Sequence, residues 1–328
     1  MALPWGGAAP LVLWLIVIGT DAIFGGLPGL RAVLDAPLAA VGGIGRWLDG
    51  RLNRPRRSEA SRRIRGLIVT LVVAVPAWFA GMGLVDLARD LPYGWLIEAA
   101  VVLCLLGQRR PIDGVRRVAA ALAAGDLDRA RTALAPLVRF DTATLDSHGV
   151  ARGAVEACAG RLAEGLVGGA LWYAVLGLPG LCTFRAVNAL ARVIGRPSPR
   201  QAAFGFAARR LDDALTLIPA LIAGALFVLA ALFTASANPL RALRTWLADV
   251  RARAGAAAGR AEGAVAGALG LSLGGPRPYD DGPLPGSWIG EGRARTAVTD
   301  IRRAVLLASV MALLFATLIA AILAARLV

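Results

Sequence analysis

The sequence contains no lysine, a single histidine and only three cysteines. All 36 basic residues are therefore arginines. The absence of lysine excludes a P-loop lysine, a pyridoxal-phosphate Schiff base and any lysine nucleophile. Cys104, Cys158 and Cys182 form no CxxC pair, and His148 is the one histidine. The sequence thus argues against a zinc site, a disulfide framework and a histidine-based triad.

Apolar residues, in contrast, are abundant. They make up 57% of the chain, with a mean hydropathy of +0.63, whereas a soluble domain has roughly 45–50%. The net charge of +14 could suggest nucleic acid. The arginines, however, lie between long apolar runs, where positive charge meets anionic headgroups in membrane proteins. We therefore expect a lipid bilayer as partner and no nucleic acid.

Three apolar runs predict an N-terminal membrane segment over residues 1–107 with about three spans. They are Leu11 to Leu30, Gly66 to Leu87 and the shorter Tyr93 to Gly107. A bilayer core of about 30 Å needs about 20 helical residues, which the first two runs provide. The uncharged start of the first run predicts a retained span rather than a cleaved signal peptide.

Asp21 lies inside the first run, where an acid costs roughly 2.5–3.5 kcal/mol on insertion scales. It either has a partner or a function, or it lies near water at an interrupted end, since Gly25 and Pro28 follow. The sequence leaves both open. The arginine-dense residues 46–65 are predicted on the cytoplasmic side.

Three further regions follow. Residues 108–165 predict amphipathic helices, residues 166–303 a membrane and motif-bearing region, and residues 304–328 a final transmembrane helix. GLPG at 177–180 could be a helix break, a re-entrant turn or a loop, so the topology of residues 166–235 stays open.

These patterns predict an all-α, polytopic integral membrane protein with about five or six spans and cytoplasmic amphipathic helices. We expect it in the inner (cytoplasmic) membrane of a bacterium. The oligomeric state stays open, and a homo-oligomer is compatible with the sequence.

Several short strings interrupt the helical periodicity with polar residues or glycines. They are GDLDRAR at 125–131, RFDTATLD at 139–146, AVEACAGRLAEG at 154–165, FRAVNAL at 184–190, AARRLDDALTLIPA at 207–220, AEGAVAGALGLSLGGPRPY at 261–279, SWIGEG at 287–292 and TDIRRA at 299–304. In this order and spacing the chain resembles the adenosylcobinamide-phosphate synthases of the CobD/CbiB family, over roughly residues 108 to 310.

The resemblance implies a ligase of cobalamin biosynthesis. Such an enzyme joins aminopropanol, or its phosphate, to a carboxylate of the corrinoid adenosylcobyric acid, with ATP and Mg2+ as cofactors. This amide synthesis needs acids for the metal, cations for phosphate, and backbone N–H donors in glycine-rich turns.

Carried over residue by residue, the resemblance implies catalytic roles for five acids, two of which would also bind metal. The acids are Asp141, Glu156, Asp212, Asp213 and Glu262, with Asp212 and Asp213 as the metal ligands. It implies substrate binding by Thr142, Asn188, Arg209, Gly274, Gly275 and Trp288.

Each assignment has a structural alternative. Asp141 could cap the following helix, Asn188 could make a packing hydrogen bond, and Arg209 could form a surface ion pair with the acids three and four residues later. The glycines after Glu262 could serve tight helix packing.

The chain departs from the family pattern at Phe140, Gly160, Arg161, Ala191 and Ala257, where the family has Arg, Glu, Asn, Asp and Asn. Arg161 would repel a divalent ion if it faced the site. The departures leave a second reading open, in which the chain is a non-catalytic relative with a corrinoid-binding or regulatory, AmpE-like role.

A transporter has little support, because intramembrane charge is confined to Asp21 and Glu98, with no evident partner.

Overall fold

A computed structural model describes residues 9–25, 28–106, 108–252, 260–279 and 282–327. The chain forms two compact units that alternate along the sequence. The first unit comprises residues 1–107, 168–215 and 316–328, and the second comprises residues 108–167 and 216–315.

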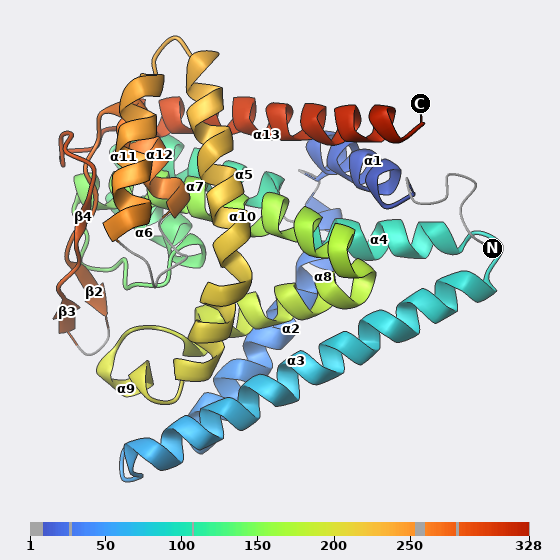
Figure 1. Ribbon diagram of the computed structural model, residues 1–328. Coiled ribbons are helices and arrows are strands. Elements are labelled where there is room, and N and C mark those ends of the chain that lie inside the picture. Colours follow the sequence, from blue (N-terminus) through green and yellow to red (C-terminus); the bar gives the residue numbers. More distant parts are fainter. Residues whose placement is uncertain (1–8, 26–27, 107, 253–259, 280–281, 328) are drawn as a thin grey trace. The chain divides into compact units, whose positions relative to one another are not determined.

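The first unit is entirely helical in its described part (Figure 1). It contains α1 (Ala9–Phe24), α2 (Pro28–Leu52), α3 (Glu59–Asp90), α4 (Gly94–Leu106), α8 (Gly169–Ile194) and the short α9 (Pro199–Ala202), together with the start of α10 (Phe206–Leu232) and the end of α13 (Val298–Leu327).

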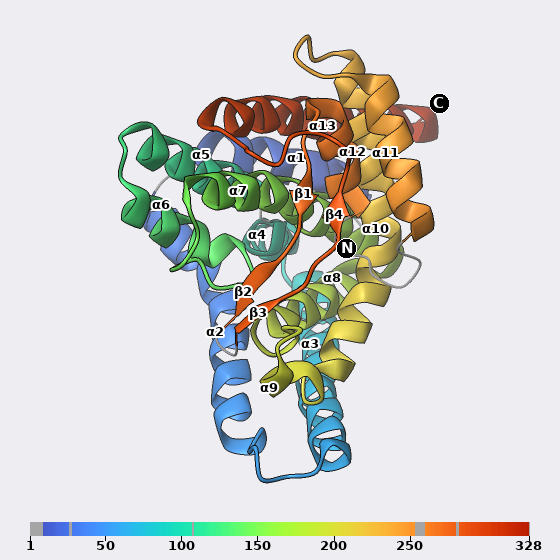
Figure 2. The same cartoon turned by 90° about the vertical axis from the view of Figure 1, so that its left-hand side faces the viewer.

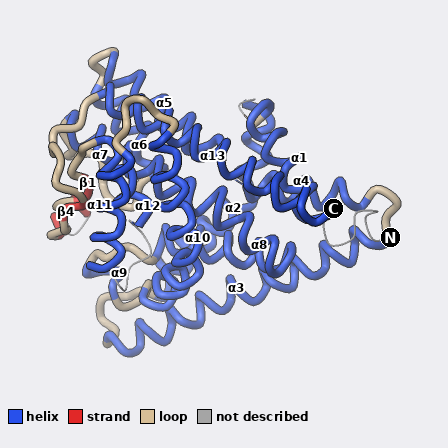
Figure 3. The backbone as a smooth tube through the Cα atoms, turned by 45° about the horizontal axis from the view of Figure 1, so that its top comes forward, coloured by secondary structure: helices blue, strands red, loops and turns tan. Residues whose placement is uncertain are grey.

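The second unit adds four short strands to its helices, as Figures 2 and 3 show. The helices are α5 (Arg109–Ala123), α6 (Leu127–Leu134), a 3₁₀ turn (Ala135–Leu137), α7 (Ser147–Leu162) with a π-helical continuation (Ala163–Gly168), α11 (Pro239–Ala252) and α12 (Arg260–Leu269), together with the later part of α10 and the earlier part of α13. The strands are β1 (Leu273–Gly274), β2 (Arg277–Tyr279), β3 (Gly282–Leu284) and β4 (Trp288–Ile289).

The predicted all-α membrane class is confirmed. Among the described residues, four helical stretches are long and apolar enough to cross a membrane: Glu59–Asp90, Ser147–Ile194, Phe206–Leu232 and Val298–Ala325. The predicted run Gly66 to Leu87 lies within the first of these stretches, and the predicted final helix at 304–328 overlaps the last. α4 has 13 residues, or about 20 Å, and is short for a bilayer core of about 30 Å.

α3 shows what a lipid-facing helix of this chain looks like. Leu67, Ile68, Leu71, Val72 and Phe79 are all about half exposed or more on it. An apolar surface this long is expected to face lipid rather than water. Pro76 lies inside the helix without ending it.

Two glycines of α3 allow close approach inside the first unit. A Cβ on Gly81 would lie 2.5 Å from Pro179 of α8, and one on Gly66 would collide with the carbonyl of Phe204. Around this contact, Val69 and Val73 of α3 pack in a buried cluster with α8 residues that include Leu190. In lipid no hydrophobic effect draws helices together. Small residues at a crossing instead let the helices approach closely, so that van der Waals contacts stabilise the pair.

The GLPG string is a bend within α8. Gly177 has φ 64° and ψ −154°, a conformation that is essentially restricted to glycine. Figure 1 shows α8 as two helical arms that meet at a sharp bend. Helical residues continue on both sides of Gly177, so the string breaks a helix and is not a loop between two separate helices.

The prediction of one continuous first span over Leu11 to Leu30 is wrong. α1 ends at Phe24 and α2 begins at Pro28. Proline suits the first position of a helix, because its missing N–H needs no partner there. Asp21 thus lies in the last turn of α1, where it is buried and has side-chain or electrostatic contacts.

Glu98 also has a partner, contrary to the sequence prediction. The hydroxyl of Tyr173 in α8 donates to Glu98 Oε1 of α4 at 2.7 Å, and the Tyr173 ring stacks on Trp14 of α1. Tyr173 and Glu98 are 75 positions apart, too far for local spacing to predict the pair.

The amphipathic pattern predicted for 108–165 holds in part. α5 buries residues such as Val115 and Val118 on one face and exposes Arg116 and Arg117 on the other. α7, however, is buried almost all round from Gly149 to Leu162. Its small residues, mostly alanine and glycine, let neighbouring elements approach from every side.

Candidate functional site

The structure divides the predicted site residues between the two units. Asp141, Thr142, Glu156, Glu262, Gly274, Gly275 and Trp288 fall in the second unit, and Asn188, Arg209, Asp212 and Asp213 fall in the first. Each unit therefore holds one polar cluster.

The cluster of the second unit is built on Glu156 of α7. Its carboxylate is 5% exposed, and both of its oxygens accept hydrogen bonds from the segment around β1 and β2. The backbone N–H of Gly274 donates to Oε1 at 2.6 Å, and Arg277 Nη2 donates to Oε2 at 2.7 Å. Two strings 118 residues apart therefore meet at one buried carboxylate.

Glycine is required at the donor position. Gly274 and Gly275 have φ of 76° and 79°, in the left-handed region that other residues avoid. A Cβ on Gly274 would lie 2.6 Å from the Ser287 carbonyl oxygen, and one on Gly275 would lie 2.7 Å from the Trp288 ring. The antiparallel pairing of β1 and β4, with Gly274 opposite Trp288, produces this close approach.

Arg277 is the functional candidate that the sequence analysis missed. Burial opposes its charge, but the carboxylates of Glu156 and Glu262 and the hydroxyl of Tyr279 favour it, so the pKa of Arg277 lies above its ordinary value. Its guanidinium also lies over the Phe140 ring, 5.1 Å from the centroid. Phe140, a departure from the family pattern, thus supports an arginine supplied by another segment.

The outer side of the cluster carries a second arginine. The Arg152 guanidinium lies over the exposed Trp288 ring, 5.1 Å from its centroid. Arg152, Phe140, Glu156, Gly274 and Arg277 line a small open hollow, together with Leu145, Gly149, Gly153, Pro276 and Pro278.

Glu262 lies close to the same cluster. A Cβ on Gly160 of α7, one turn after Glu156, would lie 3.4 Å from Glu262 Oε1 of α12. The neighbouring Arg161 was expected to repel a metal ion. Its Nε and Nη2 instead donate to the carbonyls of Leu137 and Pro136, at 2.9 and 2.6 Å.

Asp141 and Thr142 hold the loop before α7. Asp141 Oδ1 accepts from the N–H of Ala143 at 2.9 Å, and the Thr142 hydroxyl donates to the Arg131 carbonyl at 3.1 Å. The alternative that Asp141 caps the next helix is wrong, because Asp146 caps α7 by accepting from Gly149 N–H. The Asp141 N–H also donates to the Pro278 carbonyl, which ties this loop to β2.

The cluster of the first unit joins α8 to α10. Asn188 Nδ2 donates to Asp212 Oδ1 at 2.9 Å, and Arg192 Nε donates to Asn188 Oδ1 at 3.1 Å. Asn188 and Asp212 are 2% and 3% exposed. The partner seen for Asp212 is thus Asn188 on another helix rather than Arg209 on its own.

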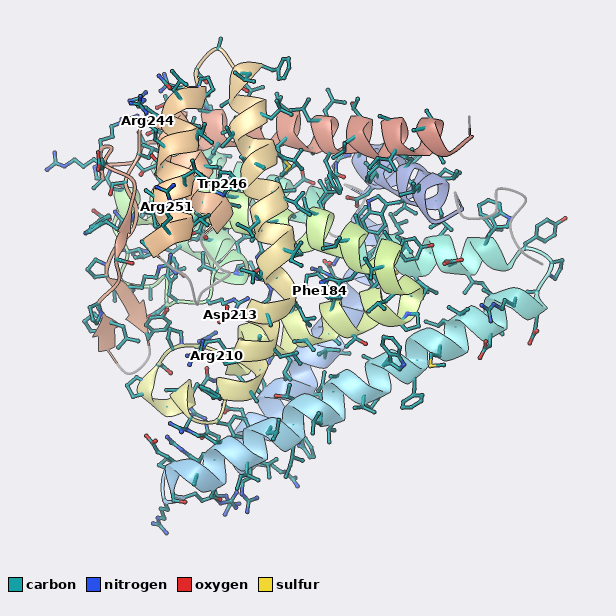
Figure 4. All side chains as sticks on the ribbon, in the orientation of Figure 1. Phe184, Arg210, Asp213, Arg244, Trp246 and Arg251 are labelled. Atoms are coloured by element: carbon teal, nitrogen blue, oxygen red, sulfur yellow. The ribbon has the colours of Figure 1, made fainter. Side chains whose placement is uncertain are left out.

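Asp213 is more accessible than Asp212. It is partly exposed, has contacts of its own, and lies on α10 one turn after Arg210, as Figure 4 shows. No group of three or more His, Cys, Asp or Glu side chains suited to a metal ion forms among the described residues. Mg2+ usually takes only one or two carboxylates and completes its shell with water and phosphate, so it needs no larger group of acids.

The other departures have structural roles or lie outside the structure. Ala191 is fully buried in the α3 and α8 cluster, where an aspartate would need a partner. Ala257, with its neighbours Gly255 and Ala256, lies outside the described residues.

Comparisons with known proteins match this chain to one family over most of its length. The family model described as CobD/Cbib protein matches residues 14–308. Relatives named "Cobalamin biosynthesis protein CobD" include one from Sinorhizobium sp that is 34% identical over 294 residues, covering 89% of this chain and 91% of the relative. One from Rhodobacter capsulatus is 32% identical over 286 residues, covering 84% and 86%. One from Brucella melitensis is 32% identical over 321 residues, covering 95% and 96%. No solved structure matches the chain.

Proposed function

This chain belongs to the CobD/CbiB protein family, and we propose that it acts in cobalamin biosynthesis by joining aminopropanol, or its phosphate, to a carboxylate of adenosylcobyric acid. We place this reaction at the inner membrane of a bacterium. The observation that carries the proposal is the buried Glu156, held by Gly274 and Arg277 from a segment more than a hundred residues away.

The contacts in this cluster support a different role for each residue. Each Glu156 oxygen already accepts a strong hydrogen bond, so Glu156 fixes the position of Arg277 rather than taking a proton from substrate. Arg277 lines the open hollow, where a guanidinium can bind a carboxylate or phosphate in a forked geometry. Arg152 and the exposed Trp288 form the outer wall of the same site.

ATP and Mg2+ are part of the proposal. When bound, ATP would supply the phosphoryl group that activates the carboxylate for attack by the amine. Asp213, with Asp212 behind it, is the pair that we propose for the metal. Asn188 keeps Asp212 in place through its amide.

Complementation of a cobalamin-requiring bacterium that lacks the synthase tests the function. Growth on adenosylcobyric acid is the readout, and membrane insertion of each variant is checked by immunoblotting. We expect rescue by the wild-type gene and loss of rescue by Asp213→Ala. Asp128→Ala is the matched control, because Asp128 is 90% exposed and pairs only within its own helix.

One observation favours the non-catalytic alternative. Gly160, which stands where the family has Glu, offers Glu262 no acidic side chain at that position, and no three-acid group forms among the described side chains. If well-inserted wild-type protein fails to rescue growth but retains bound adenosylcobyric acid on purification, the catalytic proposal is wrong and the corrinoid-binding role takes its place.

A further inference from the structure

α11 packs one face tightly inside the second unit. Ala242 and Asp249 are buried, and Gly267 of α12 has room for no side chain against Ala242 and Thr245. Trp246 lies between α11 and α10, as Figure 4 shows, and its indole occupies the space above Gly224 of α10. These contacts fix which side of α11 points outward.

The outward face carries leucines where a water-exposed helix would carry polar residues. Leu240, Leu243 and Leu247 are 66%, 38% and 39% exposed. Their spacing of three and four residues places them on one stripe, opposite Ala242 and Asp249. Leu232 at the end of α10 and Phe233 after it are also exposed, at 61% and 65%.

Arginines flank this stripe. Arg241, Arg244 and Arg251 are all exposed on α11, and the helix has a single acid, the buried Asp249. Among the described residues, Arg244 and Arg251 form no ion pair. The outer face is thus apolar along its centre and positive along its edge.

We propose that the outer face of α11 docks on anionic lipid headgroups. Leucines that insert at the boundary of headgroups and acyl chains, with arginines beside them, are the pattern of helices that lie in the membrane interface. Charge complementarity selects an anionic surface, since all exposed charge on α11 is positive. The proposal is independent of the proposed reaction.

The test uses the full chain in lipid nanodiscs, with Cys104, Cys158 and Cys182 replaced by alanine and an environment-sensitive fluorophore on Ala248→Cys. Ala248 is exposed on α11 beside the stripe. Acrylamide, a neutral quencher in water, reports the exposure of the label. We expect about twofold weaker quenching when phosphatidylglycerol is added to phosphatidylcholine, because anionic lipid draws the arginines down.

Three controls separate charge, chemistry and position. The triple change Arg241→Gln, Arg244→Gln, Arg251→Gln should abolish the lipid effect, whereas the matched triple change to lysine should keep it. A label on Ala120→Cys of α5 should show no effect, because the outer face of α5 exposes Arg116 and Arg117 but no large apolar side chain.

Two results would overturn the proposal. Equal quenching of the Ala248→Cys label in both lipid mixtures would show that headgroup charge has no influence on this face. Shielding that is the same in both mixtures but increases with the number of chains per nanodisc would assign the face to a second copy of the protein.

Discussion

The two polar clusters hold a buried carboxylate in different ways. In the second unit, Glu156 is held by a glycine N–H and by Arg277, 118 and 121 residues away. In the first unit, Asp212 is held by the side chain of Asn188, 24 residues away on a packed helix. The first arrangement depends on an unusual backbone conformation and the second on helix packing. They should therefore respond to different mutations.

Removal of the Glu156 carboxylate should have the largest effect. Glu156→Ala leaves the Arg277 guanidinium without its closest counter-charge and the Gly274 N–H without its acceptor. Breaking a buried pair from one side costs about 3–5 kcal/mol, and since the Arg277 side chain is 34% exposed we expect about 2–3 kcal/mol. The apparent Tm in one detergent at one scan rate measures the loss.

Glu156→Gln is the matched variant, because it keeps the shape and one acceptor oxygen. We expect it to lower the apparent Tm clearly less than Glu156→Ala does. Equal Tm losses in the two variants would mean that side-chain shape, rather than the charge opposite Arg277, sustains this cluster.

The backbone dependence is tested by Gly274→Ala against Gly282→Ala. Both glycines have positive φ, 76° and 109°, but only Gly274 faces a neighbouring carbonyl, whereas the space around Gly282 is open. Left-handed backbone costs an L-residue roughly 1–2 kcal/mol at either position. The Ser287 carbonyl adds a clash at Gly274, so we expect about 2 kcal/mol there and less at Gly282. A larger Tm loss for Gly282→Ala would contradict the arrangement around Gly274.

Much of the helical layout could be predicted from the sequence, because length and hydropathy decide it. α3 contains the predicted run Gly66 to Leu87, and α13 covers most of the predicted final helix at 304–328. The break between Phe24 and Pro28 was harder to predict, because hydropathy stays high across it and only a few glycines and Pro28 mark it in the sequence. The burial of α7 on all sides was not predictable, because its many alanines and glycines give too little hydrophobic periodicity to reveal it.

The site was predictable as a set of motifs but not as a set of contacts. Glu156, Gly274 and Trp288 were all assigned, yet Arg277, two residues after the paired glycines, was not. Its role depends on Glu156, which is 121 residues away, and local spacing carries no sign of such a pair. The converse held for Arg209, whose helical spacing from Asp212 suggested an ion pair where the structure has an Asn188 hydrogen bond.

We expect moderate effects on stability from substitutions at Asp212 and Asp213, where a structural role and a metal-binding role can be distinguished. Asp212→Ala removes the acceptor of the buried Asn188 amide, which should cost about 1–3 kcal/mol of stability. Asp213→Ala, at a partly exposed position, should change the apparent Tm less and abolish growth rescue. A stable Asp213→Ala protein that rescues growth fully would remove Asp213 from the proposed metal site.

The smallest expected effect compares two aspartates of the loop before α7. Asp146 accepts the Gly149 N–H at 2.7 Å as the helix cap, so Asp146→Ala should cost about 1 kcal/mol. Asp141 accepts only the neighbouring Ala143 N–H within an exposed turn, so Asp141→Ala should cost less stability. If Asp141 binds a ligand, Asp141→Ala should also weaken growth rescue while Asp146→Ala retains it. Equal rescue by both variants would leave Asp141 with a turn-forming role only.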